Sequence, residues 1–335
     1  MKVSILGTGS WGLALGKVLH GNGHSVSFWT PSIAEAEYLA KKREYKDKLP
    51  GIMLPEEFKY STDMATATED AEMLVFVVPS QFIESTAQLL GKCRAPKKIP
   101  ITVSATKGIS ERSLKRMSEV ILAHVQWLSE EEIVVFSGPT HAEEVAREVY
   151  TAIVAASKNE YSAKVVQETF SNKSLRVYTS QDLIGVELCG SVKNVIAIAG
   201  GIVDGLGHGM GDNTKAALIT RGIAEIRRLG EALGANPHTF SGLAGIGDLI
   251  VTCMSQHSRN RFVGEQIGKG KSLNEVLAHM KMVAEGVPTT RSTYALAQMS
   301  GVEMPIVNAI YETLFNNKNP KEAIDELMAR ELKAE

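Results

Sequence analysis

The chain has 335 residues, 44% of them hydrophobic, which is enough for two packed cores. Its 36 basic and 38 acidic side chains leave a net charge of −2, so no overall field favours nucleic acid or a membrane surface as a partner. The three cysteines are odd in number and widely spaced. This excludes a disulfide framework or a thiolate metal cluster and indicates a reducing, cytoplasmic setting.

Two apolar stretches need to be distinguished from targeting or membrane segments. The N-terminal stretch MKVSILGTGSWGLALG differs from a secretory signal because four glycines interrupt it and no small-residue cleavage pattern follows. The longest apolar stretch, 183–203, contains Glu187, Lys193 and Asn194. We therefore expect a buried helix of a soluble domain there, and a protein that is not membrane-integral.

Short apolar runs alternate with amphipathic segments in the first half of the chain. The runs predict strands at 3–6, 25–29, 73–78, 101–104, 133–136, 152–156 and 175–178. The segments predict helices that include 13–19, 33–42, 82–90 and 114–125. This alternation is typical of a mostly parallel sheet covered on both faces, so residues 1–182 are predicted to form an α/β domain with a Rossmann-like, doubly wound sheet.

Helical periodicity replaces the β-rich runs after residue 182. Helices are predicted at 214–233, 273–279, 290–298 and 305–315. Residues 183–335 are therefore predicted to form an all-helical substrate domain. Because no flexible linker separates the two domains, we expect them to pack closely and to enclose a cleft.

A glycine-rich loop, Gly7-Thr8-Gly9-Ser10-Trp11-Gly12, follows the first predicted strand and precedes a helix. The G-x-G-x-x-G pattern alone is common, but its position between a strand and a helix, with another strand after them, is typical of a dinucleotide site. Glycines permit the tight turn and let the backbone approach a pyrophosphate, while the helix N-terminus faces the anion. We expect NAD(P) to bind here.

The second predicted strand is not followed by the charged residue that usually contacts the adenosine ribose. Thr30, Pro31 and Ser32 come next, and Glu35 is expected to lie already inside a helix that Pro31 begins. An acidic residue at the end of this strand favours NAD, and a basic one favours NADP. The choice between NADH and NADPH stays open, although the absent carboxylate removes a repulsion against NADP.

Polar residues also follow two later strands, at the carboxyl ends where open α/β sheets bind ligands. Lys107 lies beside Gly108 and would direct a cation into the crevice. Gly138 and Thr140 precede a helix that begins near Ala142. The free N–H groups of that helix can bind an oxyanion.

The predicted helical domain contributes further candidates, each with two interpretations. Lys193 has only uncharged residues one helical turn away. In one interpretation, its side chain lies along an apolar face and its ammonium reaches water. In the other, the amine is desolvated and has the lowered pKa that suits a general base. Asp248, after a run of glycines, is a helix cap or a functional carboxylate. Arg259 and Asn260 suit a phosphate, or form an exposed basic turn.

Nine motifs carry a resemblance that extends from about residue 3 to about residue 315. They are GTGSWG, VVPSQF, SATKGI, SGPTHAEEVA, ELCGSVKNVIAIAGGIVDGL, GDNTKAALITRG, GLAGIGDLIVTC, SRNRFVG and VAEGVPTT. In this order they resemble the motifs of the bacterial-type NAD(P)-dependent glycerol-3-phosphate dehydrogenases. The resemblance implies an oxidoreductase that interconverts sn-glycerol 3-phosphate and dihydroxyacetone phosphate for phospholipid synthesis, and a homodimer. Pro31 departs from the family pattern, in which a basic residue or a histidine often follows the second strand.

The same resemblance implies a role for individual residues, with Lys193 as the catalytic proton acceptor. The implied substrate contacts are Lys107, Gly138, Thr140, Lys193, Asn194, Asp248, Thr252, Ser258, Arg259 and Asn260. The implied cofactor contacts are Gly7, Gly9, Ser10, Trp11, Gly12, Lys107, Ala142, Arg259, Val283 and Glu285. No metal is expected, because the glycines around Asp204, His208 and Asp212 predict a loop in spite of their ligand-like spacing.

Two alternatives to this function differ in class. A β-hydroxyacid dehydrogenase acting on a substrate such as 6-phosphogluconate would have the same two-domain plan and a lysine on the first long helix of the second domain. A regulator would bind NAD(P) without catalysis. The β-hydroxyacid dehydrogenase is disfavoured by the stretches SVKNVIAIAGG and SRNR. The regulator is disfavoured because it would not need the two lysines and the arginine that are expected in one cleft.

Overall fold

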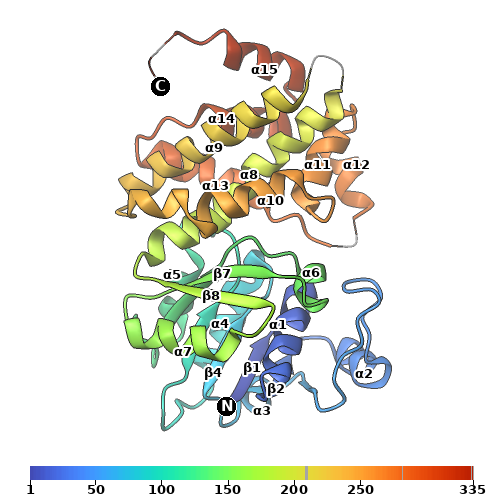
Figure 1. Ribbon diagram of the computed structural model, residues 1–335, viewed down its shortest axis with the longest axis vertical. Helices are drawn as coiled ribbons and strands as arrows, with labels where there is room; N and C mark the ends of the chain where they lie inside the picture. The colour runs from blue at the N-terminus through green and yellow to red at the C-terminus, as the bar shows by residue number, and fades with distance from the viewer. Residues whose placement is uncertain (208–209, 281, 333, 335) are drawn as a thin grey trace. The chain divides into compact units, whose positions relative to one another are not determined.

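The computed structural model describes residues 1–207, 210–280, 282–332 and 334. The chain divides into two compact units (Figure 1). The first comprises Met1–Lys107 and Lys115–Glu187, and the second comprises Gly108–Leu114 and Leu188–Glu335. The boundary at Glu187 falls inside one long helix, α8 (Leu183–Leu206), whose first residues belong to the first unit.

The first unit is built on an eight-stranded sheet. Its strands are β1 (Lys2–Leu6), β2 (Ser25–Trp29), β3 (Lys59–Ser61), β4 (Met73–Phe76), β5 (Ile101–Ser104), β6 (Ile133–Ser137), β7 (Thr151–Ala156) and β8 (Leu175–Ser180). The spatial order is β3-β2-β1-β4-β5-β6-β7-β8, and every neighbouring pair is parallel except β6 with β7. The predicted doubly wound α/β fold is confirmed. The strand order reverses between β1 and β4, where such sheets bind ligands beyond the carboxyl ends of their strands.

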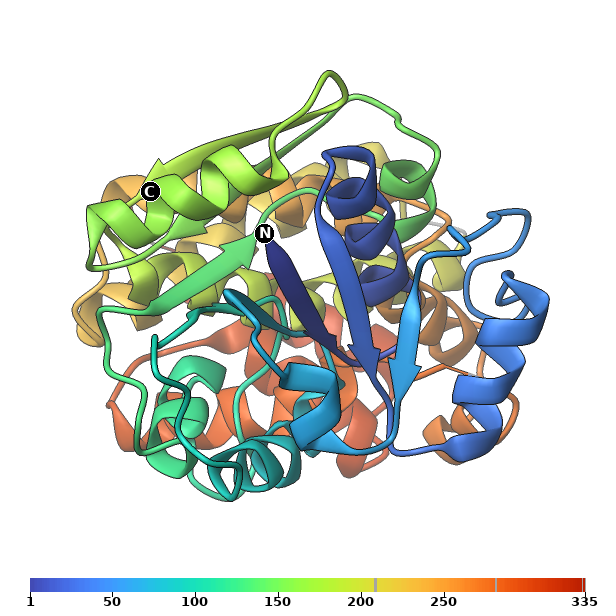
Figure 2. The ribbon, with the colours of Figure 1, turned by 90° about the horizontal axis from the view of Figure 1, so that it is seen from below.

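Helices cover both faces of this sheet, which explains why β4 and β6 are buried along their whole length. The view in Figure 2 shows α1 and α7 on one side of the strands and α3 and α4 on the other. The helices of the unit are α1 (Ser10–Gly21), α2 (Ile33–Lys42), α3 (Met64–Thr68), α4 (Ile83–Gly91), α5 (Met117–His124), α6 (Ala142–Ala146) and α7 (Glu160–Phe170). A 3₁₀ turn, η1 (Ser80–Phe82), precedes α4.

Every regular element that the structure describes in the second unit is helical, as predicted. After α8 come α9 (Asp212–Ala232), α10 (Asp248–Met254), α11 (Arg259–Gly268), α12 (Leu273–Ala278), α13 (Gly286–Met299), α14 (Pro305–Phe315) and α15 (Pro320–Met328). Two short turns, η2 (Pro237–Ser241) and η3 (Leu243–Gly247), join α9 to α10.

α8 has the length and the apolar composition of a membrane-spanning helix. Its apolar window is nevertheless entirely buried inside the protein. The apolar character of α8 therefore reflects packing inside the protein, which agrees with the expectation of a buried core helix.

α8 and α11 pack backbone against backbone because both helices carry glycines at the contact. A Cβ atom added at Gly201 on α8 would lie 1.9 Å from the carbonyl oxygen of Arg261. One added at Gly264 on α11 would lie 1.9 Å from the carbonyl oxygen of Ile198. Small residues at such a crossing allow the two helix axes to approach closely, so this helix pair admits only glycine at both positions.

The variant Gly264→Ala tests this packing. The added methyl group must separate two backbones, so we expect the free energy of unfolding to fall by about 2–3 kcal/mol. Gly21→Ala, at the exposed end of α1 where an added Cβ meets no atom within 4 Å, is the matched control and should leave stability unchanged or slightly higher. Urea unfolding followed by circular dichroism measures both. Equal stabilities for the two variants would contradict the packing constraint.

Candidate active site

The glycine loop between β1 and α1 has the shape that a dinucleotide pyrophosphate requires. Gly7 has a φ of +124°, and a Cβ at Gly12 would lie 2.5 Å from the carbonyl oxygen of Gly7, so both positions need glycine. A Cβ at Gly9 would meet no atom within 4 Å, which leaves the backbone open at this point. No acidic residue lies in the first turn of α1, so its positive end suits an anion. The loop therefore fits the expected nucleotide.

The end of β2 differs from the expectation at two points. Ser32, not Pro31, caps α2 by accepting a hydrogen bond from the N–H of Glu35, so Pro31 lies before the helix. The Glu35 carboxylate turns back toward β2 and accepts a hydrogen bond from Thr30 Oγ1 at 2.5 Å. The expectation of no carboxylate at this place is therefore wrong. The serine and the glutamate three residues later form a pattern that only predicts a helix cap, so the sequence did not show where the carboxylate points.

Lys107, Gly138 and Thr140 lie together at the carboxyl ends of β5 and β6, which are neighbours in the sheet. Lys107 Nζ donates a hydrogen bond to the carbonyl oxygen of Gly138 at 3.3 Å. Thr140 Oγ1 donates to the same oxygen at 3.1 Å. The buried residue Ala142 begins the short helix α6 just beyond them. Residues from two strands thus form one polar group in the first unit.

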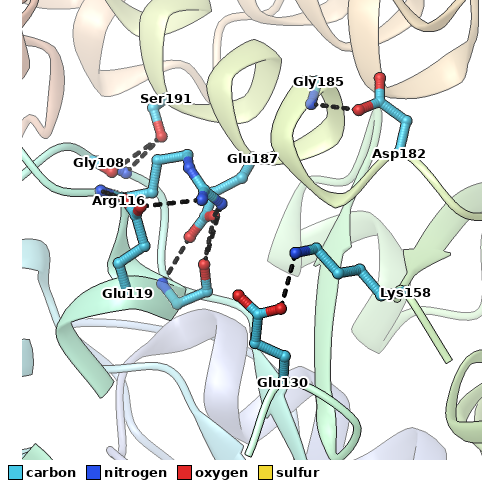
Figure 3. A network of polar contacts seen from close by, with 10 residues as sticks. Gly108, Arg116, Glu119, Glu130, Lys158, Asp182, Gly185, Glu187 and Ser191 are labelled. Atoms are coloured by element: carbon cyan, nitrogen blue, oxygen red, sulfur yellow. Dashed lines mark hydrogen bonds and ion pairs between the residues drawn. The ribbon is translucent and has the colours of Figure 1, made fainter. Parts of the chain in front are cut away.

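Polar contacts hold the first turns of α8, as Figure 3 shows. In the first unit, the buried Glu187 accepts hydrogen bonds from Arg116 Nη1 at 2.8 Å and from the N–H and the hydroxyl of Ser118, each at 2.7 Å. Burial raises the pKa of Glu187, and Arg116 and Ser118 oppose the rise. In the second unit, Ser191 Oγ accepts from the Gly108 N–H at 2.9 Å and donates to the Gly108 carbonyl oxygen at 3.0 Å. These contacts fix the part of α8 that directly precedes Lys193.

Lys193 is buried in the second unit, with 5% of its surface exposed. Its ammonium forms an ion pair with Asp248, which is fully buried, and donates a hydrogen bond to Thr252 Oγ1 at 2.6 Å. Asp248 and Thr252 lie one turn apart on α10 and therefore face the same way. The interpretation of Lys193 as a lysine whose ammonium reaches water is wrong. Asp248 is the first residue of α10, and Gly247 occupies the cap position.

Two asparagines beside Lys193 link α8, α11 and α13. Asn260 Nδ2 donates to Asn194 Oδ1 at 2.9 Å, and Asn260 Oδ1 accepts from the N–H of Gly286 at 2.8 Å. A Cβ at Gly286 would lie 2.6 Å from the carbonyl oxygen of Asn194, so the three helices meet closely here. Glu285 occupies the cap position just before α13. The two amides that the resemblance assigns to the substrate therefore also organise the helices around Lys193.

The start of α11 carries the residues expected to hold a phosphate. Ser258 caps the helix by accepting a hydrogen bond from the N–H of Arg261 at 3.2 Å. Arg259 is the first residue of the helix and is exposed, and no acidic residue lies in the first turn. A guanidinium and the positive end of a helix dipole together favour an anion. Val283, assigned to the cofactor by resemblance, is half-buried in the segment before α13.

Asp204 already has two basic partners. Lys215 Nζ and Arg261 Nε each donate to its carboxylate at 2.6 Å. Asp212 begins α9, and His208 lies outside the described residues. The carboxylate that ligand-like spacing singles out is therefore engaged in an ion-pair network.

The fold and these residues define a class of protein. The first unit has an open, mostly parallel sheet with a glycine loop at its first crossover, and the helical second unit buries a paired lysine. This is the arrangement of a two-domain, dinucleotide-dependent oxidoreductase. Residues 2–163 match the N-terminal part, and residues 182–325 the C-terminal part, of the family described as NAD-dependent glycerol-3-phosphate dehydrogenase. The chain belongs to this family, and the resemblance predicted from its motifs is confirmed.

Individual relatives agree with the family match over the whole chain. A protein from Prosthecochloris aestuarii is 48% identical over 335 residues and covers 100% of both chains. One from Geobacillus thermodenitrificans is 49% identical over 336 residues, covering 99% of this chain and 96% of the relative. Both are named glycerol-3-phosphate dehydrogenase [NAD(P)+]. The crystal structure of glycerol-3-phosphate dehydrogenase from Coxiella burnetii is similar with a TM-score of 0.92 and 36% identity, covering 98% of this chain and 99% of that chain.

The buried ion pair predicts a defined pattern of stability changes. Asp248→Asn leaves the Lys193 ammonium buried without its counter-charge, so we expect a loss of about 3–5 kcal/mol in the free energy of unfolding. Adding Lys193→Met to this variant removes the uncompensated charge and should restore part of that loss. Urea unfolding of the wild type, both single variants and the double variant measures the coupling. Additive effects of the two substitutions would contradict an energetic link between the residues.

Proposed function

We propose that the protein interconverts sn-glycerol 3-phosphate and dihydroxyacetone phosphate with NAD(P), and that Lys193 is its catalytic residue. The observation that carries the proposal is the buried cluster of Lys193, Asp248 and Thr252 in a chain of this dehydrogenase family. A secondary alcohol loses a hydride only as its hydroxyl proton leaves, so the reaction needs an acid–base group at that oxygen. A lysine withdrawn from water and held by two partners supplies such a group.

Lys193 moves the proton at the substrate oxygen in both directions of the reaction. In reduction, its ammonium donates a proton to the carbonyl oxygen of dihydroxyacetone phosphate, and its charge stabilises the alkoxide as it develops. In oxidation, the neutral amine accepts the hydroxyl proton of glycerol 3-phosphate. When NAD(P) is bound, its nicotinamide supplies or accepts the hydride.

Asp248 and Thr252 prepare Lys193 for this role. The Asp248 carboxylate stabilises the ammonium form, which is the form that donates the proton. Thr252 Oγ1 accepts a hydrogen bond from the ammonium while it donates one to the backbone carbonyl oxygen of Asp248 at 2.6 Å. Asp248 therefore favours one charge state of the Lys193 amine, and Thr252 restricts the orientation of that amine.

The start of α11 is proposed to bind the substrate phosphate. Arg259 offers a guanidinium for charge-assisted hydrogen bonds, and Ser258 and Asn260 flank it at the positive end of the helix. Asn194 lies beside Asn260 and lines the same proposed pocket. On the first unit, we assign the further substrate contacts to the group formed by Lys107, Gly138 and Thr140.

The remaining predicted residues are assigned to the nucleotide. The glycine loop would hold the pyrophosphate through backbone N–H groups at the start of α1. The proposed further cofactor contacts are Ser10, Trp11, Lys107, Ala142, Arg259, Val283 and Glu285.

We also infer that the enzyme acts in the cytoplasm as a homodimer and supplies glycerol 3-phosphate for phospholipid synthesis. The family resemblance supports the dimer and the role in lipid synthesis. The cysteines agree with a reducing compartment, because none of Cys93, Cys189 and Cys253 forms a disulfide within the described residues. Burial raises the pKa of Cys253 to about 12, so this thiol stays protonated and unreactive.

Lys193→Met tests the catalytic assignment. Losing the proton donor should lower kcat for dihydroxyacetone phosphate reduction by at least about a thousandfold. Binding of NADH, measured by calorimetry, should stay nearly unchanged. Lys215→Met is the matched control, since Lys215 is a half-buried lysine of the same unit that is also paired with an aspartate. Near-normal turnover in Lys193→Met would remove this residue from the mechanism.

Arg259→Ala tests the phosphate assignment. Loss of a charge-assisted contact should raise the KM for dihydroxyacetone phosphate by about one to three orders of magnitude, with a smaller change in kcat. Lys269→Ala removes an exposed positive charge just beyond the other end of α11 and should leave KM unchanged. Steady-state kinetics at fixed ionic strength provides the comparison. An unchanged KM in Arg259→Ala would place the phosphate elsewhere.

A further inference from the structure

A carboxylate and an ammonium lie together next to the end of β2. Glu35 accepts a hydrogen bond from Thr30 Oγ1 at 2.5 Å and one from Lys48 Nζ at 2.6 Å. The side chains of Glu35 and Lys48 are 14% and 29% exposed, so both are largely withdrawn from water but still accessible to a ligand. The end of this strand is where dinucleotide-binding sheets contact the adenosine ribose.

Two contacts tie this ion pair to the glycine loop. Ser10 Oγ donates a hydrogen bond to the backbone carbonyl oxygen of Lys48 at 2.5 Å, which holds residue 48 against the first turn of α1. Thr8, inside the loop, lies near enough to the Glu35 carboxylate to help lower its pKa. Lys48 Nζ also lies 4.5 Å from the centre of the Tyr45 ring, a cation–π contact that restricts the ammonium. Both charges are therefore fixed in position beside the expected nucleotide.

Each partner keeps the other ionised at neutral pH. Burial alone would raise the pKa of Glu35, but the hydrogen bonds from Lys48 and Thr30, together with the nearby Thr8, outweigh burial and lower it. Burial would lower the pKa of Lys48, but the contact with Glu35 outweighs burial and raises it. The ribose end of the proposed nucleotide site thus presents the negative charge of Glu35 and the positive charge of Lys48, and the two charges sum to zero.

We propose that Glu35 and Lys48 determine the nucleotide preference, and that as a pair they admit both NAD(H) and NADP(H). The Glu35 carboxylate accepts a hydrogen bond from the ribose 2′-hydroxyl of NAD(H). The Lys48 ammonium cancels the repulsion between Glu35 and the 2′-phosphate of NADP(H) and contacts that phosphate directly. This inference rests on the nucleotide binding included in the proposed function.

The test compares the Kd values of NADH and NADPH, measured by calorimetry without substrate. Lys48→Met leaves Glu35 uncompensated and should raise the ratio of the NADPH Kd to the NADH Kd by about ten- to a hundredfold. Glu35→Gln removes the repulsion and releases Lys48, so it should lower the same ratio by about threefold or more. Lys46→Met, an exposed lysine of the same loop, is the matched control and should leave the ratio unchanged.

A Kd ratio that rises in Lys48→Met and falls in Glu35→Gln supports the proposal. A ratio that moves in the same direction in both variants, or that does not move, overturns it. The wild type gives a second measurement that does not depend on the folding of a variant. Adenosine 2′,5′-bisphosphate and 5′-AMP should bind it within about tenfold of each other, and a larger difference overturns the proposal. If the wild type binds neither NADH nor NADPH, the proposed function fails, and this outcome is distinguishable from a ratio that the variants leave unchanged.

Discussion

The ion pair between Lys193 and Asp248 is the interaction on which the second unit depends. An unpaired ammonium costs several kcal/mol when it is withdrawn from water, and no residue one helical turn from Lys193 carries a charge. The compensating carboxylate comes from α10, 55 residues further along the chain. The burial of Lys193 thus requires α10 to pack against α8 in one arrangement, and the same requirement places a restrained amine at the proposed reaction centre.

Glycine packing extends this arrangement to α11. Because Gly201 and Gly264 let the two backbones touch, the start of α11 lies close enough to α8 for Asn260 to hydrogen-bond Asn194. Asn194 is the residue next to Lys193, so the proposed phosphate site and the proposed proton donor are coupled through a single helix contact. The separation between them is set by rigid backbone rather than by flexible side chains, which is what positioning a small substrate requires.

Much of this architecture could be predicted from local sequence pattern. β2, β5, α2 and α14 have the residue ranges that their apolar periodicity indicates, and the context of the glycine loop identified the class of fold. β3 could not be predicted, since three residues, Lys-Tyr-Ser, give no apolar run. The pairing of side chains that lie far apart in the sequence could not be predicted either. Nothing local connects Lys193 to Asp248, and the pattern around Glu35 indicates a helix cap rather than a carboxylate that turns back to β2 and meets Lys48.

The most direct test of this account is a crystal structure of the enzyme with dihydroxyacetone phosphate and the oxidised nucleotide bound. The account predicts that the phosphate binds at the start of α11 against Arg259 and Asn260. It also predicts that the substrate carbonyl oxygen lies within hydrogen-bond distance of Lys193 Nζ, at about 3 Å. A phosphate bound elsewhere, or a carbonyl oxygen beyond the reach of that nitrogen, would contradict the proposed proton transfer.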